Sequence, residues 1–168
     1  LRSIEAIWHY PSLCYFEGTP ISCGRGTDAP FTLFGAPWFS GYSYDAGFTP
    51  KPDHGAKHPK YEGQLCFGQL LPTDMDTAYW AINWNHLFDA YAYWKENAPT
   101  EAPEFFNAFF KKLAGSNALQ EALESGMSAQ EWVKFYKKRM WFDYQQKFDE
   151  YSLYPQLRSK TSKVYTTD

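Results

Sequence analysis

The sequence contains little cysteine, and its three cysteines, Cys14, Cys23 and Cys66, lie far apart. Their number and spacing fit neither a disulfide framework nor a zinc knuckle. One disulfide with a free third thiol and three separate thiols are both compatible with this sequence. Cysteine usage therefore excludes a disulfide-stapled fold but does not indicate a cellular compartment.

Long hydrophobic runs are also absent. The chain starts at Leu1 without methionine, and its first residues show neither a basic segment followed by an apolar one nor a stretch of about 20 apolar residues. We therefore predict no membrane span. We expect the chain to be either a processed protein or a piece of a longer one.

An excess of positive charge is missing as well. The chain has 16 Lys and Arg residues against 19 Asp and Glu residues, and the two signs are interspersed. A phosphate backbone requires a broad basic face, so nucleic acid is not an expected partner. The short basic runs Lys111-Lys112 and Lys137-Lys138-Arg139 fall on predicted helices and are typical of a solvated outer face.

Motifs for nucleotides, metals and nucleophilic catalysis are not found. The sequence has no G-x-G-x-x-G stretch, P-loop or nucleophile elbow, so we predict no cofactor. Asp53, His54 and His58 lie together in one predicted loop, without a third firm ligand or a recognised spacing. We therefore predict no metal site.

Aromatic residues, by contrast, are abundant. They make up 20% of the 168 residues, yet the mean hydropathy is −0.56, because 13 Tyr and 7 Trp keep polar groups. Such rings suit an aromatic core, or faces that stack on sugars and partners. A chain of this length is expected to form one domain, residues 1–168, that buries roughly 70% of its unfolded surface.

Strand signals fill the first half of the chain. Apolar and polar residues alternate from Ser3 to Tyr10, which predicts a half-buried strand closed by Pro11, and Tyr15-Phe16 is expected to be a second extended piece. Between Pro30 and Pro59, repeated Pro and Gly predict short strands and ordered loops. Residues 63–71 predict a strand buried on both sides.

Helix signals fill the second half. The spacing predicts a helix from residue 78 that Asn97 and Pro99 end, and helices over residues 103–113 and 118–124. A last helix is expected from Ala129 to about Tyr151, opened by Ser128 and Glu131 as a capping box. Residues 159–168 are expected to be a loose tail. Strands followed by helices predict an α+β fold, in which a small mixed or antiparallel sheet from the N-terminal half is packed by helices from the C-terminal half.

The stretch from Phe16 to Asp28 has the composition of a site. It combines the carboxylate of Glu17 with Arg25, which is flanked by Gly24 and Gly26. Glycines allow positive φ and close approach of the backbone, and a guanidinium can grip a carboxylate through two hydrogen bonds. The alternative is a tight surface turn that a Glu17–Arg25 ion pair holds shut.

Three parts of the chain together resemble the C-terminal domain of the NamZ-like exo-β-N-acetylmuramidases. The first part, which carries most of the resemblance, runs Y-P-S-L-C-Y-F-E-G-T from Tyr10 and continues as G-R-G-T from Gly24 and F-G-A-P-W from Phe34. The others are F-T-P from Phe48 with Y-E-G-Q-L-C-F-G from Tyr61, and L-A-G from Leu113 through the last helix to Y-S-L-Y-P from Tyr151. The resemblance covers nearly the whole chain.

The resemblance implies a role in bacterial cell-wall turnover. The family removes terminal N-acetylmuramic acid from the non-reducing end of peptidoglycan fragments, and this domain packs against an N-terminal Rossmann-like domain to form a cleft. The proposed catalytic carboxylate of the family belongs to that other domain, so this chain alone is expected to be inactive. The expected partners are a peptidoglycan-derived glycan or muropeptide and the N-terminal domain, and the expected location is extracytoplasmic, in the periplasm or cell envelope.

The same resemblance suggests three site residues. Glu17, Arg25 and Thr27 match the E-G-T and G-R-G-T stretches of the family and are expected to bind substrate, with Glu17 a candidate catalytic carboxylate. The chain departs from the pattern at Pro20, where Asn is common, and at Cys23, where Glu is common. The second departure removes a charge beside Arg25.

Two other hypotheses remain open from the sequence. A non-catalytic carbohydrate-binding module would show a flat, exposed aromatic platform, and a purely structural domain would bury the Glu17–Arg25 loop without a pocket. A cleft-forming domain would instead expose polar site residues. It should also gather apolar and aromatic residues such as Phe16, Phe34 and Trp38 around the loop, as a surface for its missing partner.

Overall fold

The computed structural model describes residues 1–42, 46–73, 82–138 and 151, and it divides the chain into two compact units. The first unit is Leu1–Ala129 and the second is Gln130–Asp168. Each unit is described by itself. No helix in the described part of the chain is long and apolar enough to cross a membrane.

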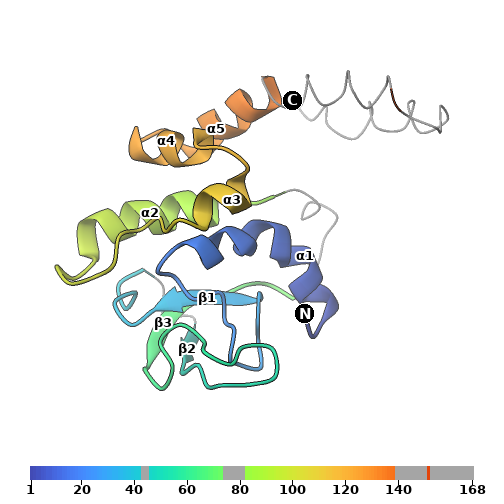
Figure 1. The fold of residues 1–168 in the computed structure, drawn as a ribbon, viewed down its shortest axis with the longest axis vertical. Helices are drawn as coiled ribbons and strands as arrows, with labels where there is room; N and C mark the ends of the chain where they lie inside the picture. The colour runs from blue at the N-terminus through green and yellow to red at the C-terminus, as the bar shows by residue number, and fades with distance from the viewer. Residues whose placement is uncertain (43–45, 74–81, 139–150, 152–168) are drawn as a thin grey trace. The chain divides into compact units, whose positions relative to one another are not determined.

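A three-stranded antiparallel sheet lies in the first unit (Figure 1). Its strands are β1 (Leu33–Ala36), β2 (Ala46–Phe48) and β3 (Cys66–Leu70), in the order β1-β3-β2. Gly35 of β1 pairs with Gly68 of β3, and a Cβ atom on either glycine would collide with a carbonyl oxygen of the facing strand. The short strands predicted between Pro30 and Pro59 are confirmed, and the α+β class with them. The strand predicted over residues 63–71 is present but shorter, and its predicted burial on both sides is wrong, because Leu70 is exposed.

The first segment is a helix, so the predicted strand over residues 3–10 is wrong. Helix α1 (Ile4–Leu13) begins after Ser3, whose hydroxyl accepts a hydrogen bond from the amide of Ala6 at 3.2 Å. The buried positions of α1 follow the period of a helix and are Ala6, His9, Ser12 and Leu13. Ile4 and Ile7 are exposed, so the positions of apolar residues in so short a run do not distinguish a strand from a helix.

The segment after α1 is helical as well. Residues Cys14–Gly18 form the 3₁₀-helix η1, so the extended conformation expected for Tyr15-Phe16 is also wrong. The amide of Thr19 ends this helix with a hydrogen bond to the carbonyl oxygen of Phe16 at 3.1 Å. Glu17 therefore projects from a helical turn rather than from the end of a strand.

The later helices agree better with the sequence. Helix α2 (Asn85–Asn97) ends where it was expected to end, but residues 82–84 are not helical, so the predicted helix is wrong there; its expected start at residue 78 lies outside the described residues. Helix α4 (Ala118–Glu124) has the predicted bounds. Helix α3 (Phe110–Ala114) is shorter than the predicted 103–113, and ends at Gly115 with a φ of 74°.

The missing turns of α3 have a local cause. The amide of Asn107 donates to the carbonyl oxygen of Gly18 at 3.0 Å, and its side-chain oxygen accepts from the amide of Phe109 at 2.8 Å. Asparagine side chains compete in this way with helical hydrogen bonds. The helix consequently starts only after the chain has crossed η1.

Helix α5 (Ala129–Tyr136) begins at the boundary between the two units, directly after Ser128 as the capping box predicted. Its expected continuation to Tyr151 and the expected tail at residues 159–168 lie outside the described residues, apart from the first two residues past Tyr136 and Tyr151 itself. Within the second unit, the rings of Trp132 and Phe135 lie 5.7 Å apart.

An aromatic cluster forms the core of the first unit. The rings of Phe16 and Phe34 stack at 4.9 Å, and both side chains are fully buried. Phe34 also contacts the ring of His86 in α2 at 5.4 Å. Helix α1 lies between the sheet and the layer of α2 and α3 (Figure 1), so an N-terminal helix shares the covering role expected only of the C-terminal ones.

Candidate functional site

The loop that carries Arg25 is shaped by its two glycines. Gly24 has a φ of 75° and Gly26 a φ of 83°. A Cβ atom on Gly24 would lie 2.6 Å from the carbonyl oxygen of Ala29, and one on Gly26 would lie 2.6 Å from that of Lys51. The glycines thus have the role predicted for them, and the close approach is to another segment of the chain.

Backbone hydrogen bonds fix this loop on both sides. The amide and carbonyl groups of Ser22 pair with those of Gly35 in β1 at 2.8 and 2.9 Å. On the far side of Arg25, the amide of Lys51 donates to the carbonyl oxygen of Gly26 at 2.8 Å. Arg25 therefore projects from a turn that is held by the sheet and by residues 51–60.

Arg25 is paired with Glu17. Its Nη1 atom donates to Oε1 of Glu17 at 2.6 Å, and its Nη2 atom donates to the carbonyl oxygen of Gly55 at 2.6 Å. The Arg25 side chain remains 45% exposed and that of Glu17 20%. Because a guanidinium has five N–H groups, this pairing orients Arg25 and still leaves donors for a ligand. The sequence predicted this pair. Because position 23 is Cys here rather than Glu, the carboxylate that pairs with Arg25 is that of Glu17.

A hollow of about 570 Å³ opens beside this pair. Besides Glu17 and Arg25 it is lined by Ser22, Cys23, Gly55, Ala56, Lys57, His58, Pro59, Lys60 and Phe109. Phe109, next to α3, is 46% exposed. The lining thus combines charged and polar side chains with the exposed rings of His58 and Phe109, and a few polar groups in such a hollow can fix the orientation of a ligand.

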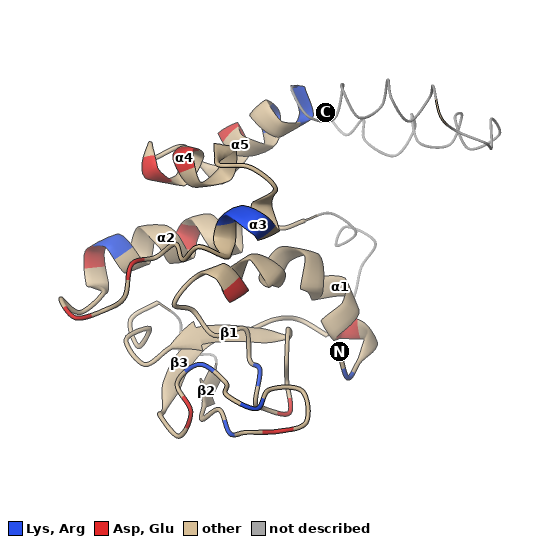
Figure 2. Cartoon of the chain, viewed as in Figure 1, with Lys and Arg blue, Asp and Glu red and all other residues tan. Residues whose placement is uncertain are grey.

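The electrostatics of the hollow favour an anion. Its lining contains the cations Arg25, Lys57 and Lys60, and among the residues described around it the only carboxylate is Glu17. Figure 2 shows Lys and Arg interspersed with Asp and Glu along the loops beside the sheet. The local excess of positive charge is therefore a property of this hollow, in a chain whose net charge is −3.

Phe109 reaches the hollow because Gly18 has no side chain. A Cβ atom on Gly18 would lie 2.6 Å from Cα of Phe110, so the start of α3 crosses directly over η1. The rings expected around the loop behave differently. Phe16 and Phe34 belong to the core, so the expectation that they form an exposed partner surface is wrong, while Trp38 is partly exposed.

Thr27 has a role inside the turn. Its hydroxyl donates to the carbonyl oxygen of Gly24 at 2.7 Å and accepts from the amide of Ala29 at 3.1 Å. It does not line the hollow. Contact of Thr27 with a substrate stays a prediction, and the hydrogen bonds that the structure describes assign its side chain to closing the loop.

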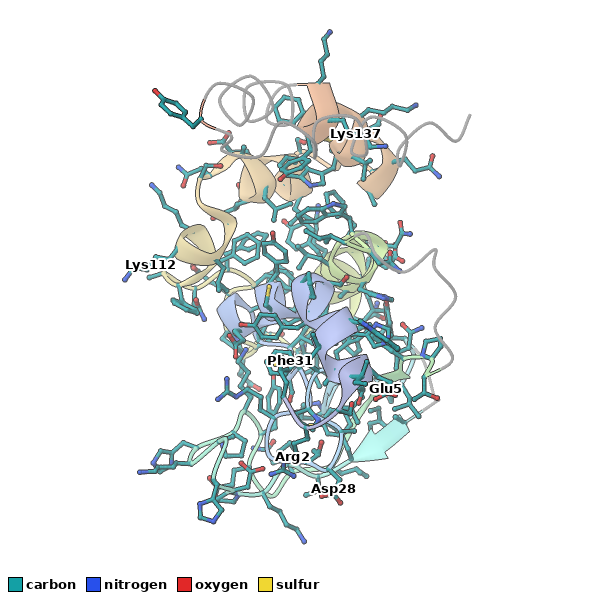
Figure 3. All side chains as sticks on the ribbon, turned by 90° about the vertical axis from the view of Figure 1, so that its right-hand side faces the viewer. Arg2, Glu5, Asp28, Phe31, Lys112 and Lys137 are labelled. Carbon is teal, nitrogen blue, oxygen red and sulfur yellow. The ribbon has the colours of Figure 1, made fainter. Side chains whose placement is uncertain are left out.

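A second ion-pair group holds the other end of the loop. Arg2 donates to the carboxylate of Asp53 at 2.6 Å and lies 3.8 Å from that of Asp28 (Figure 3). The other oxygen of Asp53 accepts from the amides of Gly55 and Ala56 at 2.8 and 2.6 Å. The latter bonds shape the turn that presents the Gly55 carbonyl to Arg25.

Neither the cysteines nor the histidines form a reactive centre in the part of the chain that the structure describes. Cys14, Cys23 and Cys66 are free, and burial raises the pKa of both Cys23 and Cys66 to about 12. Thiols with raised pKa values are poor nucleophiles. No group of three or more His, Cys, Asp or Glu residues is placed to hold a metal ion there.

Sequence reasoning found the Glu17–Arg25 pair and missed the other wall of the hollow. Gly55, Lys60 and Phe109 come from segments that carried no motif, and each is brought to the loop by contacts between distant parts of the chain. The one sequence signal near Lys60 is its position between Pro59 and a glycine-containing stretch, which indicates an ordered loop. That signal indicates no role for its amino group.

The chain is similar to known proteins in sequence and in structure. Residues 8–154 match the family described as exo-β-N-acetylmuramidase NamZ, C-terminal. The chain is 30% identical over 162 residues to the peptidoglycan β-N-acetylmuramidase NamZ of Bacillus subtilis (strain 168). This match covers 83% of the chain and 36% of that protein. A crystal structure of a DUF1343 family protein from Bacteroides fragilis matches with a TM-score of 0.71 and 37% identity, over 86% of this chain and 40% of the other. The chain therefore spans less than half the length of these relatives.

Proposed function

Because this chain belongs to the family of NamZ exo-β-N-acetylmuramidase C-terminal domains, we propose that it forms one wall of the substrate cleft of a two-domain glycosidase. The complete protein removes terminal N-acetylmuramic acid from the non-reducing end of peptidoglycan fragments. Its site of action is outside the cytoplasm, where such fragments arise. The rest of the protein supplies a Rossmann-like domain on the other side of the cleft.

The observation that carries this proposal is the oriented, half-exposed guanidinium of Arg25 at a positively charged hollow. Muramic acid differs from glucosamine by a lactyl ether that ends in a carboxylate. A planar guanidinium recognises a carboxylate through two parallel hydrogen bonds, so Arg25 is suited to select muramic acid. The bonds to Glu17 and Gly55 reduce the entropy that Arg25 would lose on binding.

The chemistry needs more than this hollow supplies. Glycoside hydrolysis by the common mechanisms uses two carboxylates on either side of the scissile bond. Glu17 is the single carboxylate in the described lining, and it is engaged by Arg25. We infer that at least one catalytic carboxylate comes from the other domain, and that Glu17 serves in orienting Arg25 or as one member of the pair.

A complementation experiment tests this division of labour. The 168-residue chain, checked by circular dichroism for folding, should release no muramic acid from a chromogenic N-acetylmuramide. Addition of the separately produced N-terminal domain should restore part of the activity of the complete protein. Hydrolysis by the 168 residues alone, abolished in Glu17→Gln, would contradict the proposal and place the chemistry here.

The binding-module alternative receives less support. It requires a flat aromatic platform, and Phe109 is the one exposed Phe, Tyr or Trp ring in the described lining of the hollow. A complete protein that binds glycan chains and hydrolyses none would nevertheless establish it. The purely structural alternative requires a buried loop without a pocket, whereas Arg25 is half exposed beside a hollow of about 570 Å³.

A further inference from the structure

The amino group of Lys60 lies inside a ring of backbone carbonyl oxygens. Its Nζ atom is 2.7 Å from the oxygen of Phe16, 3.4 Å from that of Glu17, 2.5 Å from that of Thr19 and 3.1 Å from that of Ile21. An ammonium group has three N–H donors, so three of these carbonyls can each receive one and the fourth shares one. This one side chain thus fastens a six-residue stretch of backbone.

This environment is unusual for lysine. Lysine side chains are rarely buried unless they are paired with an opposite charge. The ion pairs within the described residues are those of Arg2 with Asp28 and Asp53 and of Arg25 with Glu17, so Lys60 takes part in none of them. Burial lowers its pKa to about 8. Lys60 is partly buried, and within the described residues the printed partners of its charge are carbonyl oxygens.

The stretch that Lys60 fastens is the one that presents the site. Two of the carbonyls belong to η1, including that of Glu17 itself, and the other two lead toward Arg25. Lys60 belongs to residues 51–60, and this segment also binds the far side of the turn that carries Arg25. There the amide of Lys51 donates to Gly26, and the carbonyl of Gly55 receives Nη2 of Arg25.

We propose that Lys60 is a positioning residue, whose ammonium group gathers the carbonyls of residues 16–21 and so fixes the Glu17–Arg25 pair at the edge of the hollow. Removal of the charge takes away the donor that the structure describes for the carbonyl oxygens of Glu17, Thr19 and Ile21, whereas that of Phe16 keeps the amide and hydroxyl of Thr19, and repulsion among these oxygens opens the loop. The Glu17 carboxylate then moves relative to Arg25. Lys60 acts through this pair and makes no contact with the reacting atoms.

Other charged and titratable groups share this environment. Glu17, Cys23, Arg25, Lys57 and His58 line the same hollow, and Glu104 lines a smaller hollow of about 270 Å³ on the other side of Lys60. Glu17 and Cys23 favour the charged form of Lys60, whereas Arg25 opposes it. The matched control is Lys51, an exposed lysine of residues 51–60 whose side chain does not line the hollow.

Nuclear magnetic resonance of the 168-residue chain tests the proposal without reference to any substrate. In Lys60→Met, the Nε–H signal of Arg25 should shift to the position of an unstructured arginine, while in Lys51→Met it should stay in place. A lowered melting temperature of Lys60→Met with an unmoved Arg25 signal would overturn the proposal. It would show that Lys60 only stabilises the fold.

The wild-type chain provides a second measurement if Lys60→Met does not fold. A titration from pH 6 to pH 10 should show the Cε signal of Lys60 and the Nε–H signal of Arg25 moving with one common midpoint. An Arg25 signal that stays constant while Lys60 titrates would overturn the proposal.

Activity of the complete protein gives the last readout, and this part rests on the proposed function. Displacement of the pair by about 1 Å should lower kcat/KM on an N-acetylmuramide about 10- to 100-fold in Lys60→Met, with little effect in Lys51→Met. Normal turnover in Lys60→Met, together with a loss in Arg25→Lys, would overturn the role of Lys60. Normal turnover in both variants would instead contradict the proposed function of Arg25 and leave the resonance measurements to decide on Lys60.

Discussion

Arg25 donates from Nη1 to Oε1 of Glu17 at 2.6 Å and thereby joins the end of η1 to the glycine turn eight residues later. The pair connects two of the stretches on which the family resemblance rests. A partly exposed ion pair of this kind contributes only about 0–1 kcal/mol to stability. Its geometry therefore has more bearing on recognition than on folding.

Arg25→Lys in the complete protein should impair the recognition of muramic acid. Lysine keeps the charge but cannot make two parallel hydrogen bonds to a carboxylate, so kcat/KM on an N-acetylmuramide should fall about 10-fold or more. The corresponding N-acetylglucosaminide, which lacks the lactyl group, should be affected less. The melting temperature should change little.

Arg2→Lys is the matched control for this change, because Arg2 is also a partly exposed arginine in an ion pair but does not line the hollow. It should leave both substrates unaffected. An equal loss on both substrates in Arg25→Lys would contradict carboxylate recognition. A large fall in the melting temperature of Arg25→Lys would show that Arg25 has a structural role.

Gly26→Ala should destabilise the first unit more than Gly63→Ala does. Both glycines have positive φ values, 83° and 73°, so both changes incur the strain of about 1–2 kcal/mol that a side chain meets in this region. Only at Gly26 does the new Cβ also collide with the oxygen of Lys51 and the ring of Pro59, whereas nothing lies within 4 Å of it at Gly63. Urea denaturation should show a larger loss for Gly26→Ala, and equal losses would mean that the loop adjusts freely.

Acidification should destabilise the first unit through His86. Burial, with the neighbouring His9, lowers the pKa of His86 from 6.5 to about 4. In the unfolded chain this histidine takes up its proton near pH 6.5, whereas in the folded chain it does so only near pH 4. The free energy of unfolding is therefore complete above pH 6.5 and falls between pH 6.5 and 4, by up to about 3 kcal/mol.

A hydrogen bond of His86 also predicts that acidification lowers the free energy of unfolding. The side-chain amide of Asn83 donates to Nε2 of His86 at 3.2 Å, and a protonated ring can no longer accept there. In His86→Gln the slope of stability against pH between 6.5 and 4 should become shallower, and in the control His54→Gln, an exposed histidine, it should not change. An unchanged slope in His86→Gln would contradict this assignment.

Thiol labelling should separate the three cysteines. Cys23 and Cys66 are buried and have pKa values raised to about 12, while Cys14 is only partly buried. At pH 8 an aromatic disulfide reagent should therefore label at most one thiol in the folded chain, and all three after denaturation. Fewer than three thiols in the denatured, unreduced protein would reveal a disulfide and contradict the structure.

The sequence by itself determined much of the local structure. The bounds of α4, the end of α2, the start of α5 and the strand β3 all follow from periodicity, capping residues and the position of glycine and proline. Positive φ could be predicted for Gly24 and Gly26, because two glycines in a short turn are typical of backbone that other residues rarely adopt. The pairing of Glu17 with Arg25 was also within reach, because opposite charges eight residues apart in one loop meet readily.

Tertiary structure alone decided the rest. Residues 4–13 form a helix rather than a strand because Ala6, His9 and Leu13 form one buried face, and the contacts of this helix with η1 and α2 are ones that a ten-residue pattern cannot reveal. Gly55, Lys60 and Phe109 reach the hollow only through contacts with residues far away in the chain. Local patterns report the conformation of a segment, but the second wall of a site depends on which distant segments pack together, and that is set by the burial of the whole core.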